Sequence, residues 1–155
     1  MSQYLHIFVR QNNQFTPIYC ASRSNCMYQA LQNIAPYEKI SQLTISKISE
    51  AIDEVEITLE MYDSQIKTTR ELMKLIEASS DTLEEKCRVL GDMLIDINSY
   101  EEEKDEHKIA KIYLEFLKTI AISMSDSIDH DEAAKDLGLY AGIECGEHVT
   151  VDDIQ

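Results

Sequence analysis

The stretch ISEAIDEVEITLEMY, residues 48–62, decides the fold class because its apolar residues recur at alternating spacings of four and three. The same spacing continues in both directions from this stretch. It covers ten successive positions with one polar member: Ile45, Ile48, Ile52, Val55, Leu59, Tyr62, Ile66, Thr69, Met73 and Ile76. Such a repeat places an apolar seam along an α-helix that packs on another helix. We therefore expect a long helix from about Ser41 to Ala78.

A second, weaker apolar stripe lies off this seam on the same helix. Its members are Ile57, Met61, Leu72 and Leu75. A simple two-stranded coiled coil would leave them exposed, whereas a helix flanked on two sides would bury them. The pattern favours a helix at the centre of a bundle, with the next helix folded back as an antiparallel hairpin. A homodimer through the Ile45–Ile76 seam is the main alternative.

The sequence after residue 80 indicates further helical segments. Asp81 and Glu84 have the spacing of a capping box for a helix. The apolar stripe of that helix is Leu83, Cys87, Leu90, Leu94 and Ile97. The pattern lapses over residues 98–107 and resumes one position out of step, so we expect a loop or helix break there. Residues 109–124 are apolar around most of the helix circumference, which predicts burial by several neighbours.

The N-terminal region has the alternation of β-strands. YLHIFVR and FTPIYCA are separated by QNNQ, in which Asn12 and Asn13 suit a two-residue turn. A β-hairpin over residues 3–21 is expected, with Pro17 at an edge or a bulge because proline cannot donate to the ladder. Ser22 or Ser24 would then cap a short helix that ends near residue 33.

The C-terminal tail predicts a short helix and a strand. Residues 130–137 follow a capping aspartate and stop at Gly138, as a short helix would. Val149 and Val151 alternate with polar residues and could add a third strand to the N-terminal hairpin.

Together these elements predict a mainly α (α+β) protein. It would be an antiparallel helical bundle or a coiled-coil-like hairpin with a small N-terminal β-hairpin, which a C-terminal strand could join. We divide the chain into a hairpin and short-helix module (1–40), an acidic long-helix bundle (41–125) and a C-terminal helix and tail (126–155), within one compact unit.

The charge is concentrated in the middle of the chain. Of the formal net charge of −15, residues 45–107 contribute eighteen acids against seven bases, while residues 1–44 hold one acid and three bases. This distribution disfavours binding to nucleic acids and anionic membranes, which such a body would repel. No apolar run is long enough to span a bilayer, and the N-terminus lacks the pattern of a signal peptide. We expect a cytoplasmic protein with four reduced cysteines.

Motifs for catalysis or metal binding are absent from the sequence, so we expect no catalytic residue, cofactor or metal ligand. The acids Asp126, Asp129, Asp131, Glu132 and Asp136 do not have the spacing of a calcium loop. The possible zinc ligands Cys20, Cys26, Cys145 and His148 contain no closely spaced cysteine pair. Glu103 and His107 have the wrong offset for a di-iron helix. No nucleophile elbow or glycine-rich phosphate loop is present.

The acidic helices themselves suggest the function. A rigid rod of roughly 50 Å with this charge could occupy a basic, nucleic-acid-binding surface of a partner protein and block it, as an anti-defence protein of a virus or other mobile element would. The candidate partner-binding residues are Asp53, Glu54, Glu56, Glu60, Asp63, Glu101, Glu102, Glu103, Asp105 and Glu106. The alternatives are a homodimeric coiled-coil adaptor or assembly protein and a cryptic enzyme or metal protein.

Overall fold

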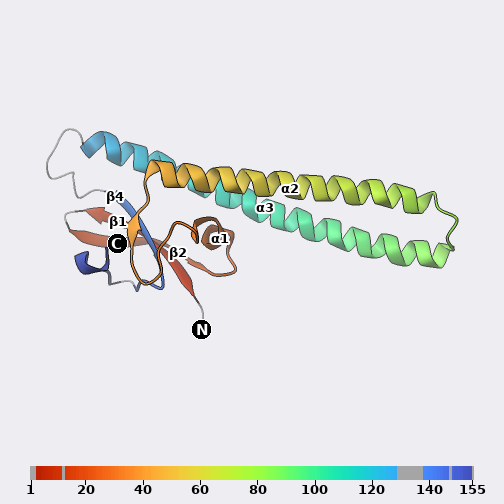
Figure 1. The fold of residues 1–155 in the computed structure, drawn as a ribbon, viewed down its shortest axis with the longest axis horizontal. Coiled ribbons are helices and arrows are strands. Elements are labelled where there is room, and N and C mark those ends of the chain that lie inside the picture. The colour runs from red at the N-terminus through yellow and green to blue at the C-terminus, as the bar shows by residue number, and fades with distance from the viewer. Residues whose placement is uncertain (1–2, 12, 129–137, 147, 155) are drawn as a thin grey trace. The chain divides into compact units, whose positions relative to one another are not determined.

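The computed structural model describes residues 3–11, 13–128, 138–146 and 148–154. The elements, in chain order, are β1 (Tyr4–Gln11), β2 (Gln14–Ser22), α1 (Cys26–Leu31), β3 (Ser41–Gln42), α2 (Ile45–Glu77), α3 (Leu83–Ile128) and β4 (Gly138–Ile143) (Figure 1). The predicted mainly α (α+β) class is confirmed, and a C-terminal strand does join the hairpin in one sheet. The chain forms two compact units, one made of Met1–Glu54 with Ala110–Gln155 and the other of Val55–Ile109.

The sheet has the strand order β2-β1-β4-β3, and all its strand pairs are antiparallel. β1 and β2 form the predicted hairpin, in which Asn13 adopts a left-handed φ of 63° at the turn. Ile7 lies opposite Tyr19 and Phe8 lies opposite Pro17, so Ile18 is the extra residue of a bulge. Pro17 thus lies beside a bulge in an edge strand, where its missing N–H is tolerated.

The C-terminal strand is not the one predicted from Val149 and Val151. The strand is β4, which pairs with β1 from Leu5 opposite Ile143 to Arg10 opposite Gly138. Residues 151–153 instead form a short 3-10 helix, because the Asp153 carboxylate accepts a hydrogen bond from the Thr150 backbone N–H (2.8 Å) and ends the extended conformation. The predicted helix at residues 130–137 lies outside the described residues.

Both faces of the sheet are packed. On one face, Tyr19 lies opposite Ile7, and its ring contacts Tyr113 of α3 with centroids 4.6 Å apart. This face also buries Leu5, Ile7, Leu139, Ala141 and Ile143. On the other face, the fully buried Phe8 packs with Ile40 and Cys145. The unit made of Met1–Glu54 and Ala110–Gln155 therefore has its own hydrophobic core.

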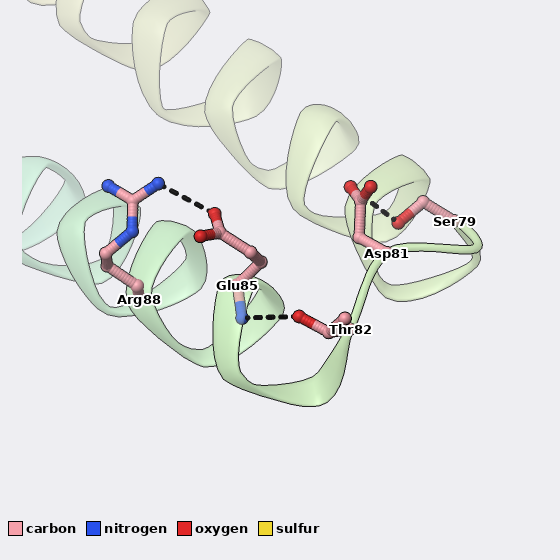
Figure 2. Close-up of polar contacts among 5 residues, drawn as sticks. All are labelled: Ser79, Asp81, Thr82, Glu85 and Arg88. Carbon is pink, nitrogen blue, oxygen red and sulfur yellow. Dashed lines mark hydrogen bonds and ion pairs between the residues drawn. The ribbon is translucent and has the colours of Figure 1, made fainter.

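The N-caps of α1 and α3 each differ by one residue from those predicted. The Asn25 side chain, and not that of Ser22 or Ser24, accepts the Met27 N–H at 2.8 Å. At the start of α3, the Thr82 hydroxyl accepts the Glu85 N–H at 3.3 Å, as Figure 2 shows.

The predicted cap residue Asp81 has another contact in the same turn, which explains the shift at α3. Its carboxylate accepts a hydrogen bond from the Ser79 hydroxyl at 3.3 Å (Figure 2). Thr82 directly precedes the first helical residue, Leu83, and therefore occupies the N-cap position.

The seam of α2 is confirmed. All ten predicted positions from Ile45 to Ile76 are buried or half-buried. Within Val55–Ile109, α2 and α3 form the predicted antiparallel hairpin (Figure 1). The seam predicted for α3 is partly wrong, because Leu83, Cys87 and Leu94 are exposed. A row of buried and half-buried positions does run along α3 at spacings of four and three: Lys86, Leu90, Met93, Ile97, Tyr100, Lys104 and His107. Val89 and Gly91 are half-buried beside this row.

The predicted break at residues 98–107 is wrong, because α3 is one continuous helix from Leu83 to Ile128. Tyr100, Lys104 and His107 keep the four-three spacing that starts before them, although none of the three is aliphatic. A lysine can line a seam with its methylene groups while its ammonium group reaches solvent. In residues 98–107 the regular spacing of apolar residues is interrupted, but the regular spacing of buried and half-buried residues continues.

Two predictions of burial are also wrong. The second stripe of α2 is exposed, so α2 is not flanked on two sides within the described structure. Several large residues of the segment 109–124 are exposed as well: Ile109, Ile112, Phe116 and Ile122. The chain therefore carries more exposed apolar surface on its long helices than a closed bundle would.

Gly91 offers a test of the continuous helix. A Cβ added at this position in α3 meets no atom within 4 Å. Alanine exceeds glycine in helix propensity by about 1 kcal/mol, so Gly91→Ala should stabilise the protein by about that amount in urea unfolding. Gly146→Ala, which also has open space but lies outside any helix, is the control and should change little. A loss of stability at Gly91 would contradict the described helix.

Candidate interaction surface

All ten predicted partner-binding acids are exposed. Eight of them lie in the hairpin unit Val55–Ile109, whereas Asp53 and Glu54 belong to the other unit. The structure thus places most of the predicted set on one helical hairpin and does not establish a single surface for all ten.

Three of these acids also hold the hairpin together. Glu101 forms a salt bridge with Arg70 at 3.0 Å, and Asp63 forms one with Lys104. Glu103 accepts a hydrogen bond of 2.6 Å from the Tyr62 hydroxyl. Salt bridges at exposed positions contribute only about 0–1 kcal/mol each, so replacing these acids would disturb the hairpin modestly.

His107 is a buried polar residue of the seam, although its spacing from Glu103 in the sequence suggested only a possible iron ligand. Its Nδ1 lies 2.7 Å from the backbone oxygen of Glu103, and its ring centroid lies 5.5 Å from that of Tyr62. Its burial could have been predicted from the sequence, because His107 continues the alternating spacing of three and four residues that runs from Ile97. Among the residues that the structure describes, no group of three or more His, Cys, Asp or Glu side chains could hold a metal ion.

The aromatic side chains near the N-terminus mostly serve the fold. Phe8 and Tyr28 are buried, and the Arg10 guanidinium lies over the rings of Phe15 and Tyr140 at 5.5 and 5.9 Å from their centroids. These contacts use the groups that could otherwise stack on nucleic-acid bases.

The cysteines differ strongly in accessibility. Cys20 and Cys87 are exposed, while Cys26 and Cys145 are buried, and none of these four forms a disulfide in the described residues. The Cys145 thiol donates to the Lys39 carbonyl oxygen at 3.0 Å. Burial raises the pKa of Cys145 to about 11, because a thiolate would be poorly solvated there.

We therefore expect two fast and two slow thiols. With iodoacetamide near neutral pH, Cys20 and Cys87 should be alkylated first, and Cys145 should react only on unfolding, because its thiol is both buried and protonated. Peptide mass spectrometry over time, with and without denaturant, checks this. Rapid alkylation of Cys145 in the folded protein would contradict the packing around it.

One side of the hairpin carries a groove with basic residues, here called the basic groove. It has a volume of about 390 Å³. Its cations are Lys67, Arg70, Lys74 and Lys104, among acids that include Asp63 and Glu101. Arg70 and Lys104 make the two salt bridges across the hairpin, so part of this positive charge is already compensated.

A second row of exposed residues on α2, which does not line the basic groove, contains no charged residue. The residues Ile57, Met61, Ser64, Thr68, Leu72 and Leu75 are exposed and recur every three or four positions. This row is here called the neutral strip. Its apolar members have exposed fractions of 66% (Ile57), 46% (Met61), 45% (Leu72) and 68% (Leu75). Ser64 and Thr68, with Met61, line a depression of about 280 Å³ that Tyr100 of α3 also lines.

Comparison with known proteins gives no match: no protein-family profile, curated protein or solved structure corresponds to this chain. In the part of the chain that the structure describes, none of the helices is both long and apolar enough to cross a lipid bilayer. The functional conclusions below therefore rest on the physical features of the hairpin.

Proposed function

We propose that this protein is a non-enzymatic interaction protein that binds a basic surface of a partner protein, in the cytoplasm, and thereby inhibits or regulates it. The observation that carries the proposal is the exposure of the acids along the continuous helices α2 and α3. A nucleic-acid-binding surface is the natural target, because it is built to attract a dense row of negative charges. An anti-defence protein of a virus or other mobile element is an example of such an inhibitor.

The continuity of α3 supports this proposal. Had residues 98–107 formed a loop, their acids would have had no fixed positions. In the helix they are held at regular intervals opposite α2, and side-chain positions fixed before binding lower the entropic cost of association. Long-range attraction also speeds the encounter with a basic partner.

A homodimeric adaptor is less well supported. The seam Ile45–Ile76, which would form the dimer interface, is already buried or half-buried within a single chain. A dimer through the same positions would have to displace α3 from α2 within the hairpin.

The test is capture of partners at two salt concentrations. Immobilised protein is incubated with lysate of its native host and washed at about 0.1 M and about 0.5 M salt, since higher salt screens exposed charges more strongly. A basic nucleic-acid-binding protein retained only at the lower concentration is the expected result. A partner retained equally at both, or further copies of the chain alone, would contradict an electrostatic function.

Two charge variants make the test specific. The first variant neutralises four predicted acids that take no part in the three contacts across the hairpin described above. Its substitutions are Asp53→Asn, Glu60→Gln, Glu102→Gln and Asp105→Asn. The control neutralises four exposed acids outside the predicted set: Glu50→Gln, Glu77→Gln, Glu84→Gln and Asp92→Asn. Each changes the formal charge from −15 to −11 by removing four negative charges. Only the first variant should lose the partner, and equal losses would mean that net charge alone decides binding.

A further inference from the structure

The neutral strip is unusual for the exposed face of such an acidic hairpin. Six successive positions at helical spacing carry no charge, and four of them are large apolar residues with 45–68% of their surface exposed. Exposed apolar residues scattered singly need no explanation, but a continuous row of this kind is typical of an interaction site.

The strip also has a concave part. Met61, Ser64 and Thr68 line the depression with Gln65 and Thr69 of α2 and Tyr100 of α3. At about 280 Å³ it is smaller than the usual small-molecule site, which ranges from roughly 300 to 1,000 Å³. A depression of this size beside an apolar row suits one or two anchoring side chains of a docked helix.

Acids flank the strip on both sides. On α2, Glu60 and Glu71 lie three or four residues from strip members and therefore neighbour them on the helix surface. Lys67, three residues from Ser64, is a basic neighbour by the same spacing, so this side of the strip carries two acids and one base. On α3, Asp96 and Glu103 lie four residues before and three after Tyr100, which lines the depression. All four acidic side chains are exposed, and together they are here called the acidic border.

We propose that the neutral strip is a docking site for a cationic amphipathic helix of a partner protein. Apolar side chains of that helix pack on the strip and in the depression, while its lysine or arginine residues lie near the acidic border. This inference rests on the proposed function and names the surface and the secondary structure that the basic partner presents.

Charge complementarity selects this occupant over a second copy of the chain. Two copies joined through this strip would bring identical acidic borders together, and each chain carries a formal net charge of −15. Like charges placed opposite one another oppose association. The basic groove shares Glu71 with the acidic border but has no residue in common with the neutral strip. A cationic helix on the strip therefore lies beside carboxylates, whereas in the basic groove it would meet ammonium and guanidinium groups.

The experiment uses a defined probe with the full chain. A fluorescent peptide of roughly 18 residues, about five helical turns, is built from leucine and lysine so that leucine forms one face of a helix. A second peptide has the same composition in shuffled order. Fluorescence anisotropy at about 0.15 M salt should show binding of the amphipathic peptide at least tenfold tighter than binding of the shuffled peptide.

Matched variants locate the binding site. Met61→Gln with Leu72→Gln should weaken binding of the amphipathic peptide at least tenfold. Leu83→Gln with Leu94→Gln removes apolar residues of similar or greater exposure (77% and 56%) outside the strip and should leave binding unchanged. If circular dichroism shows that the first variant loses helicity, Ile57→Gln with Leu75→Gln, at the more exposed strip positions, replaces it.

Each outcome has one meaning. If both peptides bind equally and the strip variants have no effect, the docking site is refuted while the acidic interaction protein stands. Failure of both peptides to bind would refute the basic-partner function as well. If the chain forms a dimer in sedimentation equilibrium that the strip variant dissolves, the occupant is a second copy and the proposal is wrong.

Discussion

Replacement of Gly142 by alanine should destabilise the unit that contains the sheet, Met1–Glu54 with Ala110–Gln155, by about 3 kcal/mol, because a Cβ at this position cannot be accommodated. The added atom would overlap the backbone oxygen of Lys39 and approach Cys145 Sγ at 2.6 Å. The Lys39 oxygen cannot move away easily, since it accepts the hydrogen bond of the Cys145 thiol at 3.0 Å. The neighbouring Ile40 is fixed too, by its backbone N–H bond to the Asp153 carbonyl (2.8 Å).

The measurement is thermal or urea unfolding of the variant beside Gly146→Ala. Gly146 is a matched control, because it lies four residues further along the chain and its added Cβ meets nothing within 4 Å. For a protein of this size, 3 kcal/mol corresponds to a decrease of about 10 °C in Tm. Equal and small effects at both glycines would mean that the approach of the Lys39 backbone to β4 is not as described.

Ile66→Asp should cost about 4 kcal/mol, because it places a carboxylate in the buried seam of the hairpin. The control is Ile57→Asp on the same helix, whose side chain is exposed and whose replacement should change stability by less than about 0.5 kcal/mol. Helicity measured by circular dichroism during urea unfolding distinguishes the two.

The pH dependence of the Ile66→Asp effect has a defined sign. Burial raises the pKa of the introduced carboxyl group above its value in the unfolded chain. The destabilisation is therefore largest at neutral pH, where the unfolded chain is ionised. It diminishes as the pH falls through the raised pKa of the folded state, and the cost of ionisation is lost below about 4, the pKa of the unfolded chain. A variant that remains fully helical but changes from dimer to monomer would instead support the homodimer through the Ile45–Ile76 seam.

The sequence was sufficient to predict the elements with regular apolar periodicity. The seam of α2 was found completely because its inward positions, Thr69 apart, carry apolar or aromatic side chains. The hairpin of β1 and β2 was found because strand alternation, the paired asparagines and Pro17 all agreed. These are cases in which the pattern of hydrophobicity and the pattern of burial coincide.

The errors arose where those two patterns separate. Lys86, Lys104 and His107 occupy inward positions of α3, so a search for apolar residues assigned the wrong face and inferred a break that does not exist. β4 was missed because GLYAGI lacks the β-branched and aromatic content typical of strands, apart from Tyr140 and Ile143. No strand was therefore predicted between the helix expected at residues 130–137 and Val149.

The candidate site was only partly accessible to the sequence. Exposure of the predicted acids agrees with expectation, but the roles of Asp63, Glu101 and Glu103 in holding the hairpin depend on their partners across it. The sequence identified the members of the second stripe of α2 correctly, but the prediction that they are buried was wrong. Whether an apolar stripe is covered depends on how many helices surround it, which local spacing does not encode.

The strand order has a consequence for synthesis of the chain. β1 is translated before the long helices α2 and α3, whereas its partner β4 is translated only after them. The helical hairpin, whose contacts join residues close in sequence, can form well before β4 arrives, because local contacts close smaller loops. Until β4 is made, β1 has only β2 as a strand partner, so the apolar face that carries Leu5 and Ile7 stays incompletely covered during synthesis.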